Sequence, residues 1–142
     1  MSALLRAALL LFATLALPGA NAHAAETQAA PFVMQMTAGD SDAQRRAFLQ
    51  IAKALEDIGP KKVQIEVVAY EGGIASLLSD NNDTATLIVA LAHNGVRFKA
   101  CRISMHGHGY TDADFPLEVE FVSAGAPEMI RLQMQGYRYW RP

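Results

Sequence analysis

Cysteine is almost missing from this chain of 142 residues, which contains a single one, Cys101. A lone cysteine cannot form a disulfide within the chain, and it excludes the paired cysteines that catalyse disulfide exchange. In an oxidising compartment, an unpaired cysteine indicates a partner thiol, a reactive site or a buried side chain. The phosphate-binding loop of nucleotide hydrolases and the complete dinucleotide-binding fingerprint are absent as well, so the sequence predicts neither kind of nucleotide site.

Positive charge is not in excess either. Lys and Arg number 12 against 14 Asp and Glu, which gives a formal net charge of −2. A protein that binds nucleic acid needs a basic surface to meet the phosphates, so this composition excludes that class. The sequence also has no internal repeat and no low-complexity tract.

Long apolar runs are lacking. The run Ala7–Leu17 is shorter than the roughly twenty residues that a membrane span requires. It follows the positive charge of Arg6 and precedes Pro18-Gly19 and the small-x-small triplet Ala22-His-Ala24. A positive start, a short apolar run and small residues at the cleavage site are typical of a secretory signal peptide.

We therefore predict that residues 1–24 are a signal peptide, with Ala22 as the second choice of cleavage site after Ala24. No cysteine lies nearby, so attachment to lipid through a cysteine is excluded. The mature protein would be exported, most simply to a bacterial periplasm, without membrane association. An uncleaved N-terminal anchor is the alternative. Residues 25–31 are expected to be a disordered lead-in to a single domain, residues 32–142, which is long enough to bury a core.

Strand and helix signals alternate along that domain. Strands are predicted at residues 32–36, 63–70, 96–101, 117–122 and 137–140, and helices at residues 41–58, 74–78, 83–93 and 127–135. The first helix is expected to begin at Ser41 in a capping box with Gln44, and to end at Gly59-Pro60. Because the connections are short and no hairpin signal occurs, the pattern predicts an α/β fold with a parallel sheet and helices on both faces.

Cys101 ends the predicted strand Val96–Cys101. Alternation along a strand places its thiol on the same face as Arg97 and Lys99, and Arg102 follows it directly. Cations near a thiol favour the reactive thiolate, and the carboxyl ends of parallel strands face the binding crevice of such sheets. We therefore predict that Cys101 is accessible and nucleophilic. The alternative is a small buried hydrophobe, which free cysteine often is.

The stretch after Cys101 is rich in glycine and polar residues, and we expect a flexible loop. Lys99, Arg102, Ser104 and His106 are the side chains predicted to support the thiol. Since no general base is visibly placed beside Cys101, although His106 could fold back toward it, the sequence favours a carrier or binding protein over a catalyst. Thiolate and imidazole also suit soft metals. A metal site of Cys101, His106 and His108 is thus an alternative, although their spacing is no strong signature and no cofactor is expected.

Several segments resemble the DsrE/DsrF-like family. They are Ile65–Ala69 with Gly73-Ile74 and Leu77-Leu78, Gly95-Val-Arg-Phe-Lys-Ala-Cys101 with Ser104-Met105, Ser123-Ala-Gly125 with Glu128–Arg131, and the ending Gln135–Tyr139 with Pro142. The resemblance implies a three-layer α/β/α domain, DsrE-like and flavodoxin-like in arrangement, with a mostly parallel five-stranded sheet. It also implies homo-oligomers, and a cysteine at Cys101 that carries sulfur as a persulfide between donor and acceptor proteins. The family's turn His-Gly-Pro-Gly is replaced here by Tyr70-Glu-Gly-Gly73.

Two of the predicted strands carry charge on one face. If they are neighbours, as the resemblance implies, Arg97 and Lys99 lie across from Glu118 and Glu120. Such pairs contribute only about 0.2–1 kcal/mol each when exposed. This part of the sheet should then be a solvent edge or a subunit contact, and we expect the contact.

Three functions are consistent with these observations. The first is a sulfur-handling protein that carries or binds sulfur through Cys101. The second is an oligomeric interaction module with a vestigial cysteine. The third is a periplasmic soft-metal binder that uses Cys101, His106 and His108.

Overall fold

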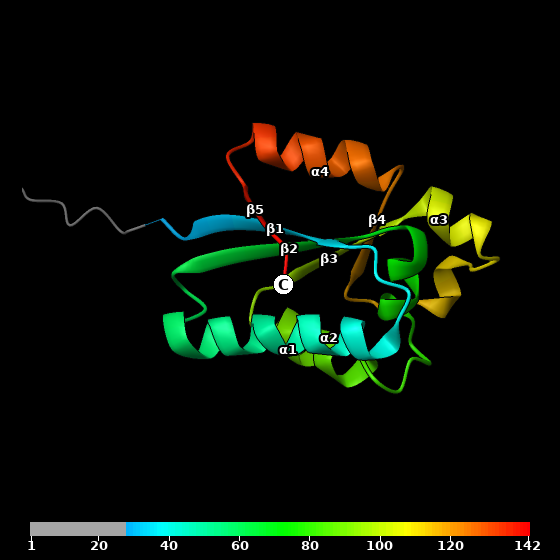
Figure 1. The fold of residues 1–142 in the computed structure, drawn as a ribbon, viewed down its shortest axis with the longest axis horizontal. Helices are drawn as coiled ribbons and strands as arrows, with labels where there is room; N and C mark the ends of the chain where they lie inside the picture. The colour runs from blue at the N-terminus through cyan, green and yellow to red at the C-terminus, as the bar shows by residue number, and fades with distance from the viewer. Residues whose placement is uncertain (1–27) are drawn as a thin grey trace, which may run out of the picture.

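The computed structural model describes residues 28–142, so the predicted signal peptide lies outside the described residues. The described part forms one five-stranded sheet in which every neighbouring pair is parallel (Figure 1). The strands are β1 (Ala30–Met36), β2 (Val63–Ala69), β3 (Arg97–Cys101), β4 (Val119–Val122) and β5 (Arg138–Trp140). β1 begins at Ala30 instead of Phe32, because Ala30 and Pro31 pair with Val63 and Gln64 of β2.

Helices cover both faces of this sheet, as predicted. They are α1 (Ser41–Ile58), α2 (Ala85–His93), α3 (Arg102–Gly107) and α4 (Gly125–Met134), with the 3-10 turns η1 (Glu71–Leu77) and η2 (Asp112–Asp114). α1 and α2 lie on one face and α4 lies on the other (Figure 1). The strand order is β4-β3-β2-β1-β5, which differs from the flavodoxin order 2-1-3-4-5. β2, β3 and β4 are added in turn on one side of β1, and β5 then lies on the other side. None of the helices in residues 28–142 is both long and apolar enough to cross a bilayer.

The start of α1 differs from the predicted capping box. Asp40 is the N-cap residue, and its Oδ1 accepts a hydrogen bond from the N–H of Ala43 at 2.8 Å. The side chain of Gln44 donates instead to the carbonyl of Ala38 at 2.7 Å. Asp is as good an N-cap as Ser, so the residue type alone does not favour Ser41 over Asp40. The predicted end is confirmed, because Gly59 has φ 100° and its N–H donates to the carbonyl of Leu55.

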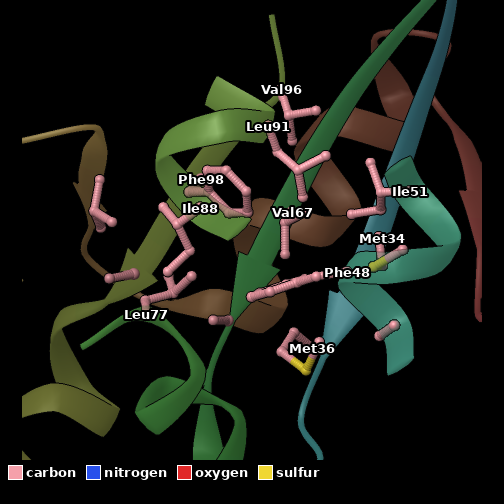
Figure 2. Close-up of a cluster of buried hydrophobic side chains, with 14 of the residues drawn as sticks. Met34, Met36, Phe48, Ile51, Val67, Leu77, Ile88, Leu91, Val96 and Phe98 are labelled. Atoms are coloured by element: carbon pink, nitrogen blue, oxygen red, sulfur yellow. The ribbon is translucent and has the colours of Figure 1, made fainter. Parts of the chain in front are cut away.

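The main hydrophobic core lies between the sheet and the two helices α1 and α2 (Figure 2). Phe48 of α1 and Phe98 of β3 meet there edge to face, with ring centroids 5.6 Å apart. A smaller cluster of Val33, Val68, Met129 and Leu132 packs beneath α4 on the other face. Central strands of a parallel sheet bury both faces, and Val67 and Val68 of β2 are accordingly both buried, one in each cluster. Leu117, which lies within the predicted strand 117–122, is fully exposed, and β4 begins only at Val119.

Candidate functional site

Cys101 lies at the carboxyl edge of the sheet, where three strand ends meet. Cys101 pairs with Val122 at the end of β4, and Ala100 pairs with Ala69, the last residue of β2. α3 begins directly after Cys101, which is its N-cap residue, so the predicted flexible loop is wrong. Met105 explains the difference, since its fully buried side chain anchors this glycine-rich stretch in the main core.

The thiol is buried, contrary to the predicted accessibility: Cys101 is 3% exposed. The alternation that placed Cys101 and Lys99 on one face is correct. That face is not open to solvent, however, because α4 lies over it (Figure 1). The sequence could not show that a helix covers this face, since α4 begins more than twenty residues after Cys101 in the sequence.

The surroundings of the sulfur favour the thiolate. Burial by itself raises the pKa of Cys101. The Ser104 hydroxyl and the backbone N–H groups of Ser104, Gly125 and Ile103 act in the opposite direction, and together they hold the pKa below its ordinary value. The predicted direction is therefore found, but its cause is neutral hydrogen-bond donors instead of cations.

The two predicted cations are engaged elsewhere. Arg102 forms a two-pronged ion pair with Asp112, with nitrogen–oxygen distances of 2.8 and 3.2 Å, and it stacks on the ring of Phe121. Lys99 is directed to two buried carboxylates. Of the predicted supporting residues, Ser104 is thus the one that the structure places on the thiol.

Ser104 is itself held by the turn after β2. Its Oγ accepts a hydrogen bond from the N–H of Glu71 at 2.7 Å, which leaves the hydroxyl proton available to the sulfur. Glu71 has φ 51°, the left-handed region, and a residue with a Cβ is held there at a cost of roughly 1–3 kcal/mol. Backbone strain at Glu71 is therefore located at the residue that orients Ser104.

Tyr70 also belongs to this site, although it was not among the predicted site residues. Its ring lies against Gly125, where an added Cβ would come within 2.6 Å of ring atoms. Its hydroxyl accepts a hydrogen bond from Gln35, which in turn accepts one from the hydroxyl of Tyr139 at 2.8 Å. Burial is the main cause that raises the pKa of Tyr70, and the nearby Cys101 adds to it. Its position in the sequence could have indicated this role, because Tyr70 directly follows β2, the neighbour of the strand that ends at Cys101.

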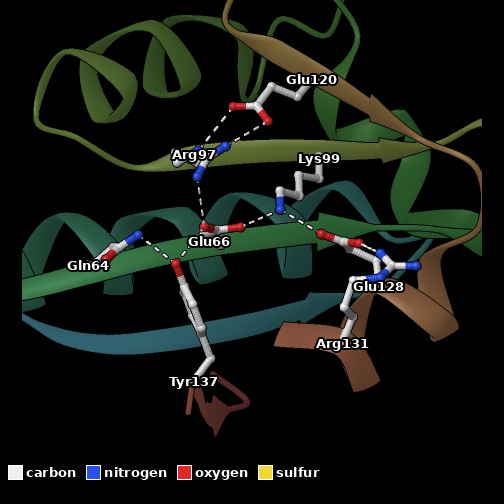
Figure 3. A network of polar contacts seen from close by, with 8 residues as sticks. All are labelled: Gln64, Glu66, Arg97, Lys99, Glu120, Glu128, Arg131 and Tyr137. Carbon is white, nitrogen blue, oxygen red and sulfur yellow. Dashed lines mark hydrogen bonds and ion pairs between the residues drawn. The ribbon is translucent and has the colours of Figure 1, made fainter. Parts of the chain in front are cut away.

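The charged face next to the thiol forms a network of ion pairs (Figure 3). The Nζ of Lys99 lies 2.6 Å from Glu66 of β2 and 2.6 Å from Glu128 of α4. Arg97 binds both carboxylate oxygens of Glu120 at 3.0 Å and reaches Glu66 at 3.1 Å.

This network confirms part of the predicted charge pairing. β3 and β4 are neighbours and Arg97 does pair with Glu120, whereas Glu118 forms no ion pair within residues 28–142. Neither a solvent edge nor a subunit contact is needed for Lys99, because α4 of the same chain covers it. Burial of Lys99 beneath a helix of its own chain is thus a third arrangement, which was not predicted.

The histidines are not gathered around the thiol. His106 lies exposed in the last turn of α3, and His108 stacks on the ring of Tyr110. In the described part of the chain, no group of three or more His, Cys, Asp and Glu side chains could hold a metal ion. Cys101, His106 and His108 thus form no three-ligand site in this structure.

Comparison with known proteins finds similarity to a protein family and to solved structures. A model of the DsrE/DsrF-like family matches residues 30–141. The solved structure of a protein of unknown function from Methanobacterium thermoautotrophicum is similar, with a TM-score of 0.73 and 28% sequence identity. The similarity covers 80% of this chain and 99% of that one. No curated protein matches the chain.

Proposed function

The chain belongs to the DsrE/DsrF-like family, and from this we propose that it is a sulfur-handling protein that carries sulfur as a persulfide on Cys101. The observation that supports the proposal most directly is the set of donors around the sulfur. A side chain that only fills space needs no such donors, whereas a nucleophile must be a thiolate. The same N–H and hydroxyl groups would also stabilise the negative charge of a persulfide.

The proposed transfer step needs no external oxidant. The Cys101 thiolate attacks the outer sulfur of a donor persulfide, R–S–SH, and forms a new S–S bond. The S–S bond of the donor breaks, and the donor thiolate leaves with the electron pair of that bond. Cys101 then carries S–SH, which loses its proton to give the persulfide anion.

Burial of the thiol limits the access of a sulfur donor to Cys101. Cys101 is 3% exposed, and Tyr70, α3 and the first turn of α4 surround it. The proposal therefore requires that one of these segments moves, or that the donor is as small as a low-molecular-weight persulfide.

Intact mass after exposure to glutathione persulfide tests the proposal. We expect one added sulfur atom on the wild-type protein, removed again by a reducing thiol, and none on Cys101→Ser. An unmodified mass after prolonged exposure, with the protein folded throughout, would refute the carrier function.

The burial of Cys101 favours one other candidate, an interaction module in which the cysteine only fills space. Under that function, Cys101→Ala should retain the assembly state of the wild-type protein, and neither protein should take up sulfur. Sulfur uptake that depends on Cys101 decides between the two.

We also propose export to the periplasm, on the basis of the leader pattern in residues 1–24. N-terminal sequencing of the protein recovered from its own cells should begin at Ala25, or at His23 if the second-choice site is used. A mature protein that still starts at Met1 would contradict this proposal.

A further inference from the structure

The buried ion pair between Lys99 and Glu128 joins β3 to α4 close to the thiol of Cys101. On β3, Lys99 stands two positions before Cys101, so the two side chains project from the same face of the strand. On α4, Glu128 follows Gly125 by three positions, which places the two on one face of the helix. β3 and the first turn of α4 are thus joined by the charges at Lys99, and the Gly125 N–H of the same turn lowers the pKa of Cys101 as a hydrogen-bond donor.

The ion pair is buried, and each of its two groups has a second charged partner. Lys99 Nζ and Glu128 Oε1 are 2.6 Å apart, and their side chains are 9% and 8% exposed. Glu66 contacts the same ammonium group from β2, and Arg131 contacts the second oxygen of Glu128 (Figure 3). A buried charge is costly to leave without its partner, so this geometry strongly opposes any movement of Glu128 away from β3.

At the start of α4 the ring of Tyr70 packs against Gly125, and the ion pair is the polar side-chain contact that ties this turn to β3. Gly125 has no side chain, and Tyr70 leaves no room for one. The apolar contacts of the helix come later, at Met129 and Leu132 in the small cluster. The ion pair is therefore the contact best placed to hold the first turn of α4, and with it the Gly125 N–H, at a fixed distance from the sulfur.

We propose that Lys99 and Glu128 are positioning residues for the Cys101 thiol, which act by fixing the Gly125 N–H as a hydrogen-bond donor to the sulfur. This inference deepens the proposed function, because it explains how the thiolate is maintained. It does not depend on whether the thiolate accepts sulfur.

The direction in which Glu128→Gln shifts the thiol titration distinguishes a positioning role of Glu128 from a direct effect of its charge on the sulfur. Removing the negative charge of Glu128 would, through the field alone, make the thiolate easier to form and move the thiol titration to lower pH. Loss of positioning would displace the Gly125 donor and move the titration to higher pH. Glu128→Gln therefore gives opposite results under the two explanations.

The experiment is a titration of the thiolate by its ultraviolet absorbance, with Cys101→Ser as the blank at each pH. Since Cys101 is the only cysteine, the difference spectrum reports this thiol alone, and it does not require a reagent to reach a buried atom. Glu120→Gln is the matched control, because it makes the same chemical change in the same network, on β4 instead of α4.

For Glu128→Gln we expect a titration at higher pH and roughly tenfold less thiolate at pH 7, the effect of about one charge-assisted hydrogen bond. For Glu120→Gln we expect the wild-type curve. Should the single change unfold the protein, the double variant Lys99→Met/Glu128→Met removes both charges of the pair and leaves Glu66 paired with Arg97. Its titration should also move to higher pH. An unchanged or acid-shifted titration in a folded α4 variant, or an equal shift in Glu120→Gln, would overturn the inference. Sulfur uptake is measured in a separate experiment. If the protein takes up no sulfur, the titration of the thiolate still tests the positioning role of Lys99 and Glu128.

Discussion

Gly125 lies so close to Tyr70 that a single added carbon would come within 2.6 Å of the tyrosine Cβ and of two of its ring atoms. The glycine is required by this contact and not by its backbone conformation, since Gly125 is not among the residues of positive φ. Because the same residue supplies an N–H to the sulfur, the tyrosine and the thiol are coupled through one peptide unit.

Gly125→Ala should therefore destabilise the protein by roughly 1–3 kcal/mol, since an overfilled core forces its neighbours to move. Urea unfolding measures the change. Gly107→Ala is the control: it lies in α3 with no atom within 4 Å of an added Cβ, and it should be neutral or stabilising by up to about 1 kcal/mol. Equal stability of Gly125→Ala and the wild-type protein would contradict the close packing of Tyr70.

Ser104→Ala should move the thiol titration to higher pH. The hydroxyl of Ser104 lowers the pKa of Cys101, so its removal leaves less thiolate at neutral pH. Ser104→Thr keeps a hydroxyl and should retain most of the wild-type behaviour. The titration by absorbance described above is the measurement, and identical curves for the alanine and threonine variants would exclude a role for the hydroxyl.

The depressed pKa of Cys101 also makes a prediction about stability against pH. A thiol that loses its proton more easily in the folded state stabilises the fold above its unfolded pKa, near the ordinary value of 9.0. That contribution is lost as the pH falls through the folded pKa. The difference in unfolding free energy between the wild-type protein and Cys101→Ser should thus grow as the pH rises toward 9. A difference that is independent of pH would mean that the thiol has the same pKa in both states.

Tyr137 should have the opposite effect at alkaline pH. Burial, followed by its hydrogen bond to Glu66 at 2.7 Å, raises its pKa to about 12 from 10.0. The stability that its neutral hydroxyl provides is complete below pH 10 and is lost as the pH rises toward 12. Tyr137→Phe should cost about 1 kcal/mol at neutral pH, and its stability should fall less steeply between those two values. Parallel stability curves for the two proteins would contradict the assignment.

Assembly remains a proposal, and it no longer involves Lys99. We expect light scattering of the purified protein at micromolar concentration to show a homo-oligomer. Lys99→Glu would place a third acid between Glu66 and Glu128, so it should unfold the single chain instead of selectively separating subunits. Glu120→Gln alters the exposed part of the network without this cost. A monomer at all concentrations would contradict the proposed assembly.

Most of the fold could be predicted because its signals are local. The apolar spacing from Ala47 to Leu55 and the β-branched run of β2 depend only on residues near in sequence, and both elements formed within a few residues of their predicted bounds. α3 was missed because a stretch ending in Gly-His-Gly has little helix propensity of its own. The buried side chain of Met105 stabilises it, and that contact exists only in the folded protein.

Of the site, the sequence allowed the prediction of its central residue, Cys101, and of the face of β3 on which its thiol lies. Alternation correctly placed Cys101 and Lys99 on the same side of β3. It could not indicate that Glu128 and Gly125 would arrive there from α4, or that Glu71 would orient Ser104. These contacts join segments that are distant in sequence, and a charge on a strand looks the same whether water or a helix covers it.

Glu66 carries a further consequence for how the chain folds. It is a charge in the middle of the central strand, and it faces α4 while Ile65 and Val67 on either side face the main core. If β2 paired with its neighbours one residue out of place, every side chain would change sides, and Glu66 would enter the space around Phe48 and Phe98. No cation would meet it among those apolar side chains. The correct alignment is thus the one that gives this carboxylate Lys99 and Arg97, so a single acidic residue discriminates against misaligned sheets before the native one is complete.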